Sequence, residues 1–264
     1  MHKNGPVALA FNALVIAFML APLVVVCVVA FTPENTLTLP TTHFSLRWFR
    51  AVFEHSDFVQ SFWNSLWLAL ASATLATVLA VPAGLAITRY EFAGRDFLNG
   101  LFLSPLIIPH LVLGVALLRM FTLVGGTGSA TWLLLAHALI VTPYTLRLVV
   151  AALVGFDRSA EQAAQSLGAG PFTVFWRITL PMILPGVTGG WMLAFINSFD
   201  EVTMSIFVTA PSTVTLPVRM YMYATESIDP MMAAVSALMV AATAAAMVVL
   251  DRVYGLDKVL VGEK

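Results

Sequence analysis

Two adjacent acidic residues stand out in this chain because apolar residues surround them. Asp200 and Glu201 lie near the end of an apolar run that extends from about Ile183 to Val208. A carboxylate in the middle of a membrane costs about 2.5–3.5 kcal/mol on insertion scales, so acids there should face water or a cation. Counting about 1.5 Å per residue along a helix puts both acids in its outer half. We predict that Asp200 faces a solute path; in the alternative, the helix ends earlier and both acids face outer water.

The neighbours of these acids complete the predicted path. Successive residues on a helix point about 100° apart, so Glu201 should lie beside the path that Asp200 faces. The residues predicted to line the path are Asn197, Phe199, Asp200, Glu201 and Met204.

Histidine and cysteine offer no further site. His110 and His137 lie in other apolar runs, and we expect interior side chains whose hydrogen bonds are satisfied. Neither has an acidic residue close to it in the sequence, so no proton relay can be drawn. The sequence has no Cys-x-x-Cys or His-Glu-x-x-His spacing, which excludes the common metal motifs. The single Cys27 is interpreted as a packing residue. We predict no catalytic residues and no metal ligands.

A polar segment, Glu161–Pro181, interrupts the apolar sequence. Its first half has apolar residues spaced i, i+3, i+4 and i+7, which predicts one face of a helix formed by Ala160, Ala163, Ala164 and Leu167. Gly168 and Gly170 should end this helix, and Pro171 suits the first turn of a second short helix that ends at Leu180-Pro181. Alanine lets another backbone come close. The segment is therefore interpreted as a knob that fits a groove of a partner protein.

Composition assigns the whole chain to the membrane. Of its 264 residues, 59% are hydrophobic and only 10% are charged, whereas a soluble domain has about 25% charged residues. The net charge of −1 gives no basic character that would favour nucleic acid. The first apolar run is also longer than the 7–15 residues or so of a signal-peptide core, which indicates an uncleaved span.

Six apolar runs are long enough to cross a bilayer, which takes about 20 residues. They are predicted at about 7–31, 62–88, 97–118, 130–153, 183–208 and 231–254. If the N-terminus is cytoplasmic, nine Lys and Arg residues lie at the inner side and four at the outer side, as the positive-inside rule requires. Both termini and the Glu161–Pro181 segment are then cytoplasmic. Pro105 and Pro109 either break the third run or only kink it.

The knob resembles a known motif. Gln162-Ala163-Ala164, Gly168, Ile178 and Leu180-Pro181 are similar to the EAA loop of permease subunits of bacterial ABC importers, Glu-Ala-Ala-x3-Gly-x9-Ile-x-Leu-Pro. Both gaps have the length of the motif, although Gln162 replaces its first Glu and Glu161 comes just before. The resemblance extends from about Phe44 to about Leu238, through Asn64-Ser65-Leu66 at the start of the second span and Leu103-Ser104-Pro105 in the third.

The resemblance implies a fold and a set of residues that couple this chain to separate ATPase subunits. It implies an all-α, type I ABC importer permease fold: one domain over residues 1–264, with a core at about 57–254 and an EAA, or coupling, loop at about 154–182. The implied ATPase-coupling residues are Glu161, Gln162, Ala163, Ala164, Leu167, Gly168, Ile178, Leu180 and Pro181.

The implied partners are two cytoplasmic ABC ATPase subunits, a second permease and a periplasmic substrate-binding protein, assembled in a bacterial inner membrane. The chain lacks Gly-x4-Gly-Lys-Ser/Thr. We therefore expect no cofactor on this non-catalytic subunit, and ATP and Mg²⁺ in the ATPases.

The string Ser198-Phe199-Asp200-Glu201 is similar to the spermidine/putrescine branch of these permeases, whose substrates are polycations that suit carboxylates. Related importers of amino-acid derivatives, opines or other small cations share much of this string and stay open as alternatives. Two readings outside the family are a self-sufficient secondary transporter, which should show an inverted repeat, and an intramembrane enzyme, which should place a nucleophile near a base.

Overall fold

The structure is a computed structural model that describes residues 5–39 and 43–254. Over these ranges the chain is helical and contains no β-strand. The described residues divide into two compact units, one of residues 5–39, 43–60 and 219–254 and the other of residues 61–218. We describe each unit by itself.

Within the part of the chain that the structure describes, four helical segments are long and apolar enough to cross a membrane. They are α1 (Pro6–Val29), α3 (Ser56–Arg89), α6 (Ala130–Val154) and the continuous segment Pro171–Phe199. A bent pair, Arg95–Leu106 with His110–Leu123, makes a fifth candidate. The predicted sixth run is α12 (Met231–Tyr254). Its stretch Met231–Ala245 counts as a shorter apolar helix and not as a candidate span. The all-α prediction is confirmed, whereas six spans remain a prediction.

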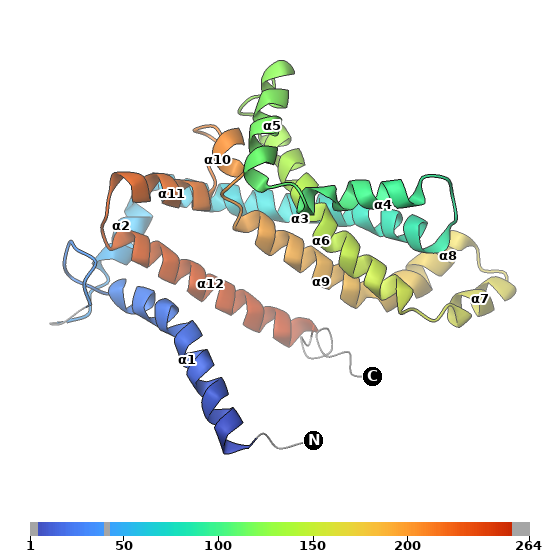
Figure 1. Ribbon diagram of the computed structural model, residues 1–264, viewed down its shortest axis with the longest axis horizontal. Helices are drawn as coiled ribbons and strands as arrows, with labels where there is room; N and C mark the ends of the chain where they lie inside the picture. Colours follow the sequence, from blue (N-terminus) through green and yellow to red (C-terminus); the bar gives the residue numbers. More distant parts are fainter. Residues whose placement is uncertain (1–4, 40–42, 255–264) are drawn as a thin grey trace. The chain divides into compact units, whose positions relative to one another are not determined.

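The first unit pairs α12 with α1 and with α2 (Arg47–Glu54) (Figure 1). Helix α2 is strongly amphipathic and buries Trp48 and Val52, because its apolar residues recur at helical spacing. The Trp48 indole N–H also donates to the Glu34 carbonyl at 3.1 Å. Further along, α11 (Leu216–Glu226) reaches α12 through a turn in which Tyr223 donates its hydroxyl to Asp229 at 2.5 Å.

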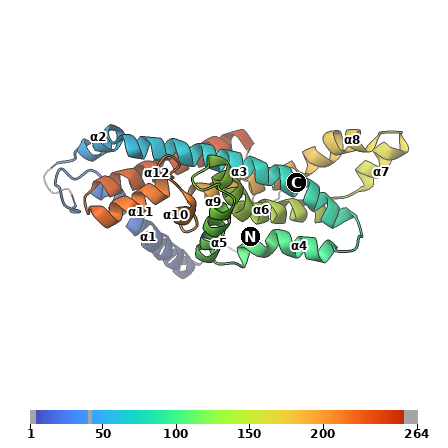
Figure 2. The ribbon, with the colours of Figure 1, turned by 90° about the horizontal axis from the view of Figure 1, so that it is seen from above.

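The second unit is built on α6 and α9 (Leu180–Phe199), which lie side by side (Figures 1 and 2). Their backbones approach closely at two glycines of α9. A Cβ added to Gly190 would lie 2.9 Å from the Thr145 Cα, and one added to Gly186 would lie 2.8 Å from the Leu148 carbonyl oxygen. Thr145 also donates its hydroxyl to the Gly190 carbonyl at 3.1 Å. Small residues at this spacing are typical of packed helices in membranes.

The third predicted span is broken and not merely kinked. Helix α4 (Arg95–Leu103) continues into a single 3-10 turn, and α5 (His110–Leu123) leaves it at an angle of 102°. Pro105 and Pro109 lie at this break. Proline lacks a backbone N–H and disfavours helix in the residue before it, which explains why the helix stops here.

The predicted end of the fifth span is wrong. Helix α9 ends at Phe199 and not at Val208; a separate short helix, α10 (Ser205–Val208), follows. Because the chain turns at Asp200, the two adjacent acids lie beyond the helix end.

Candidate functional site

The EAA loop (residues 154–182) joins α6 to α9 through α7 (Ser159–Ser166) and α8 (Pro171–Val174), which form a hairpin at one end of the second unit (Figure 2). Gly168 follows α7 with φ +86°, a left-handed conformation. Its N–H donates to the Gln165 carbonyl at 2.9 Å, and the Ala169 N–H donates to the Ala164 carbonyl at 3.0 Å. This is a Schellman cap, so the prediction that Gly168 ends the helix is confirmed.

The start of α7 is stabilised by Asp157. Its carboxylate accepts the Ser159 N–H at 2.9 Å and the Ser159 hydroxyl at 2.8 Å. These two hydrogen bonds, the backbone one first, lower the pKa of Asp157 below its usual value.

Leu180-Pro181 does not end the second short helix, contrary to the sequence prediction. Helix α8 continues through a π-helical segment, Phe175–Thr179, directly into α9. Pro181 lies in the first turn of α9. A π segment inserts an extra residue into a helix, and such segments recur at functional sites. The helical backbone of the loop therefore runs without a break from α8 into α9.

One face of the EAA loop is exposed. Gln162, Ala163, Gly168 and Leu167 lie on it, and Leu167 is 89% exposed. Phe172 and Trp176 add exposed aromatic area, with ring centroids 6.0 Å apart. Apolar side chains gathered on an exposed loop mark an interaction surface more often than isolated ones do.

The other face of the loop turns inward. Glu161 is buried and accepts an N–H from Arg89, the last residue of α3, at 2.7 Å. The hydroxyl of buried Thr179, in the π segment, donates to the same carboxylate oxygen. Of the remaining predicted coupling residues, Ala164, Ile178 and Leu180 are half-buried and Pro181 is exposed. The structure thus separates Glu161 from Gln162 and Ala163, which the sequence analysis had grouped with it.

The predicted path residues separate in the same way. Asp200 is exposed, and Asn197 and Phe199 are half-buried; the Asn197 amide donates to the Leu193 carbonyl at 2.8 Å. Glu201 and Met204 are buried in the second unit, with Met204 in its hydrophobic core.

Glu201 has a partner that the sequence did not indicate. The His110 Nδ1 lies 2.7 Å from one Glu201 oxygen, and the other oxygen accepts the Met204 N–H at 2.7 Å. His110 is therefore not isolated: it begins α5, directly after the break. The two residues are 91 positions apart, and no local pattern could have paired them.

His137 fits the expectation of a satisfied interior histidine. It is fully buried, with Nδ1 2.9 Å from the Ser198 hydroxyl and Nε2 3.0 Å from the Ser205 hydroxyl. Ser72 of α3 donates to Ser198 at 2.8 Å. These bonds tie α3, α6 and the end of α9 together.

An aromatic row runs along α9 and reaches the helix end beside Asp200. Trp191, Phe195 and Phe199 recur every fourth residue, and their rings stack at centroid distances of 5.7 and 5.9 Å. All three are half-buried. Helix α3 takes part, because Phe62 meets Phe199 edge-on at 6.3 Å and Thr74 accepts the Trp191 indole N–H at 3.1 Å. Of these three residues only Phe199 was predicted as a site residue, although the spacing of four on an expected helix was a usable signal.

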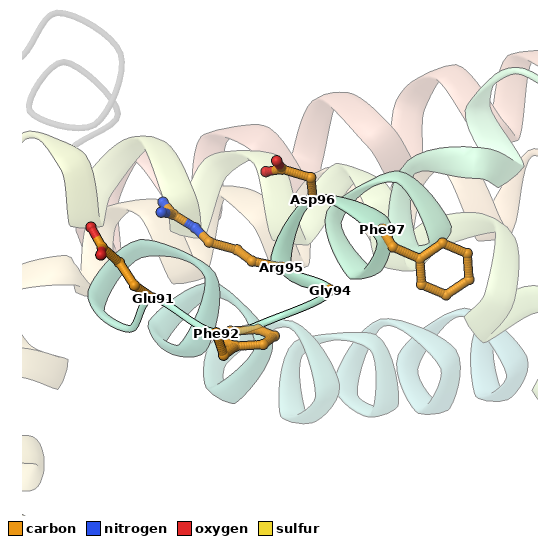
Figure 3. Close-up of a pocket in the computed structure, with 6 residues that line it drawn as sticks. All are labelled: Glu91, Phe92, Gly94, Arg95, Asp96 and Phe97. Carbon is orange, nitrogen blue, oxygen red and sulfur yellow. The ribbon is translucent and has the colours of Figure 1, made fainter.

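A small hollow lies in the turn between α3 and α4, close to Arg89. Figure 3 shows Glu91 and Arg95 extending to one side of this turn and Phe97 pointing to the other. Charged groups are exposed here. No group of three or more His, Cys, Asp or Glu side chains that could hold a metal ion occurs within the described ranges 5–39 and 43–254.

The structure combines continuous apolar helices with one bent pair, α4 and α5. The exposed two-helix loop joins α6 to α9. This arrangement is that of a multi-pass membrane protein of the permease type. The comparisons agree. Residues 76–256 match the family described as "Binding-protein-dependent transport system inner membrane component". The chain belongs to this family and is a permease subunit of an ABC importer.

Its relatives include polyamine permeases. It is 32% identical to the "Spermidine/putrescine transport system permease protein PotC" of Haemophilus influenzae, over 88% of this chain and 90% of that one. It is 30% identical to the "Putrescine transport system permease protein PotI" of Escherichia coli, over 85% and 82%. Among solved structures, a bacterial ABC transporter that imports the polysaccharide alginate has a chain of the same fold, with a TM-score of 0.72, 14% identity, and 96% and 100% covered.

Proposed function

We propose that this chain forms half of the translocation path of an ABC importer and takes up the movement of two ATPase subunits through its EAA loop. In this proposal a second, homologous permease supplies the other half, and a periplasmic binding protein delivers the solute. Six spans cross the membrane, with α12 as the sixth and both termini in the cytoplasm. ATP and Mg²⁺ bind in the ATPases. Closure of the ATPases on ATP then displaces the loop and switches the path from inward-open to outward-open.

The outward face of the loop carries the docking part of this proposal. Gln162, Ala163 and the strongly exposed Leu167 present a small, mostly apolar surface. A short helix with alanine on its exposed face can enter a groove that bulkier side chains would block. The continuity of this loop with α9 through the π segment gives the movement a direct route into the membrane helices.

We propose further that the solute is a small organic cation, such as a polyamine. The support is the position of Asp200, which directly follows Phe199 at the end of the aromatic row. Glu201 is already engaged by His110, so Asp200 is the exposed member of the acidic pair. A cation over an aromatic face gains about 0.5–2 kcal/mol, depending on how dry the site is. One ammonium group could pair with Asp200 while the methylene chain lies along Phe199 and Phe195.

Uptake by the reconstituted importer tests both parts. Proteoliposomes would contain this chain with its second permease and ATPases, and the binding protein would be loaded with labelled spermidine or putrescine. Ala163→Arg should abolish ATP-driven uptake without preventing membrane insertion, because a long cation cannot enter a groove that fits alanine. Wild-type uptake by Ala163→Arg would refute the loop as the docking site.

Asp200→Asn should lower uptake of the polyamine while the complex still assembles. Equal uptake by Asp200→Asn and wild type, across several polycations, would remove Asp200 from the path. Transport of an amino-acid derivative or an opine in place of polyamines would refute the polyamine assignment and leave the ATPase coupling intact.

A further inference from the structure

We propose that Glu161 is a positioning residue that fastens the EAA loop to α3 through Arg89, so that α3 and α9 move together when the ATPases close. Glu161 then acts inside the permease and does not contact the ATPase. This inference rests on the proposed ATP coupling and identifies the route that the movement takes.

Three elements meet at the Glu161 carboxylate. Arg89 ends α3, Glu161 lies in the first turn of α7, and Thr179 ends the π segment that precedes α9. Arg89 and Thr179 both donate to the same oxygen of Glu161. The side chains of Glu161 and Arg89 are only 4% and 17% exposed. We call these residues the Arg89–Glu161–Thr179 cluster.

Arg89 also reaches the segment that follows α6. Its guanidinium lies 5.7 Å from the centroid of the Phe156 ring, in a cation–π contact. The cluster therefore contacts both chain segments that enter and leave the EAA loop, as well as the end of α3. A buried, charge-assisted contact of this kind is costly to break, because it leaves an unpaired charge in the interior.

The cluster supplies a connection that the covalent chain does not. The EAA loop is joined by the chain to α6 and α9, whereas Arg89, at the end of α3, lies 72 residues before Glu161. Helix α3 nevertheless carries Phe62 and Thr74, which contact the aromatic row of α9. If α9 moved without α3, these contacts would separate. The Arg89–Glu161 contact lets a displacement of the loop reach both helices that hold the row.

Charge exchange in the reconstituted importer is the functional test. Arg89→Glu and Glu161→Arg should each lower the amount of solute transported per ATP hydrolysed by about fivefold or more, the lower end of typical coupling energies. The double variant Arg89→Glu with Glu161→Arg should recover most of the loss. Arg89→Lys, which keeps the charge, should stay close to wild type. ATPase binding should persist in all of them, since Gln162 and Ala163 are unchanged.

Several outcomes would overturn the inference. Wild-type coupling in Glu161→Gln, which keeps the size but loses the charge, would show that the ion pair is not needed. Loss of ATPase binding in this isosteric variant would also overturn the inference, because docking would then depend on the Glu161 contact itself. Absence of ATP-dependent uptake in the wild-type complex would instead refute the proposed function, so the two failures are distinguishable.

A distance measurement tests the joint movement directly. Spin labels would be placed at Leu79 on α3 and at Gln165 on α7, both exposed, in a Cys27→Ser background that has no other cysteine. In the wild-type background the distance between the labels should be the same with and without a non-hydrolysable ATP analogue. With Glu161→Gln it should shift or broaden when the analogue binds. An equal nucleotide-dependent change in both backgrounds would refute the inference.

Discussion

Replacing Gly168 by alanine should weaken docking of the ATPase, because the left-handed backbone at this position is what turns the chain from α7 towards α8. Gly168 has φ +86°, and no atom lies within 4 Å of a Cβ added there. The cost of alanine is therefore conformational and not steric. A left-handed residue with a Cβ costs about 1–2 kcal/mol. If only the capped loop can dock, affinity should fall by about 5–30-fold, the factor that corresponds to this energy.

A second glycine of the same loop provides a matched control. Gly155 ends α6 in a right-handed conformation with φ −77°, and a Cβ there would make only ordinary contacts, the nearest at 3.6 Å. Gly155→Ala should therefore bind the ATPase like wild type. Gly168→Asn should recover part of the affinity, since asparagine adopts left-handed conformations more readily than alanine.

The assay is a titration of the ATPase against the permease complex in lipid nanodiscs, read as an apparent Kd. Unfolding should be followed in parallel, so that a loss of affinity can be separated from a loss of the fold. Equal affinities for Gly168→Ala and wild type would contradict the reasoning. So would an equal loss in Gly155→Ala, because the backbone conformation would then not be the cause.

Three further predictions concern the rest of the fold. Gly190→Leu should destabilise the protein by about 1–3 kcal/mol in thermal unfolding, because its side chain would enter the contact between α9 and α6; unchanged stability would contradict this contact. His110→Ala should lower stability by about 1–3 kcal/mol by leaving the buried Glu201 carboxylate without its partner, and the double variant with Glu201→Ala should lose less than the two single losses added. Burial, and then the hydrogen bond to Asp229, raise the pKa of Tyr223 to about 12. Its contribution to stability is therefore complete below pH 10 and lost as the pH rises through about 12; a Tyr223→Phe difference spectrum that shows ionisation near pH 10 would refute this.

The sequence was sufficient wherever the deciding interactions are local. Hydrophobic runs predicted the apolar helices, and Gly168 predicted the end of α7, because propensity and capping act within a few residues. The motif spacing of the EAA loop identified the family, which the match over residues 76–256 confirms. The end of α9 was missed because apolar residues continue beyond Phe199 into α10, and hydrophobicity alone does not mark a turn.

Contacts distant in sequence could not be predicted. The chain bends by 102° between α4 and α5, and His110 at the start of α5 then contacts Glu201. In the same way, Glu161 turns inward because its carboxylate pairs with Arg89 at the end of α3. Both pairings depend on tertiary packing. A single sequence carries no periodic signal for them.

The two acidic positions follow one physical rule. At each position a buried carboxylate has an exposed neighbour in the sequence. Glu161 is buried next to exposed Gln162, and Glu201 is buried next to exposed Asp200. A buried carboxylate needs hydrogen-bonding partners. Glu161 has Arg89 and Thr179, and Glu201 has the His110 ring and the Met204 N–H. Their exposed neighbours need no such partner inside the protein and stay available for other molecules. The inward acids therefore hold the structure in place, and it is the outward residues that we expect to contact the ATPase and the solute.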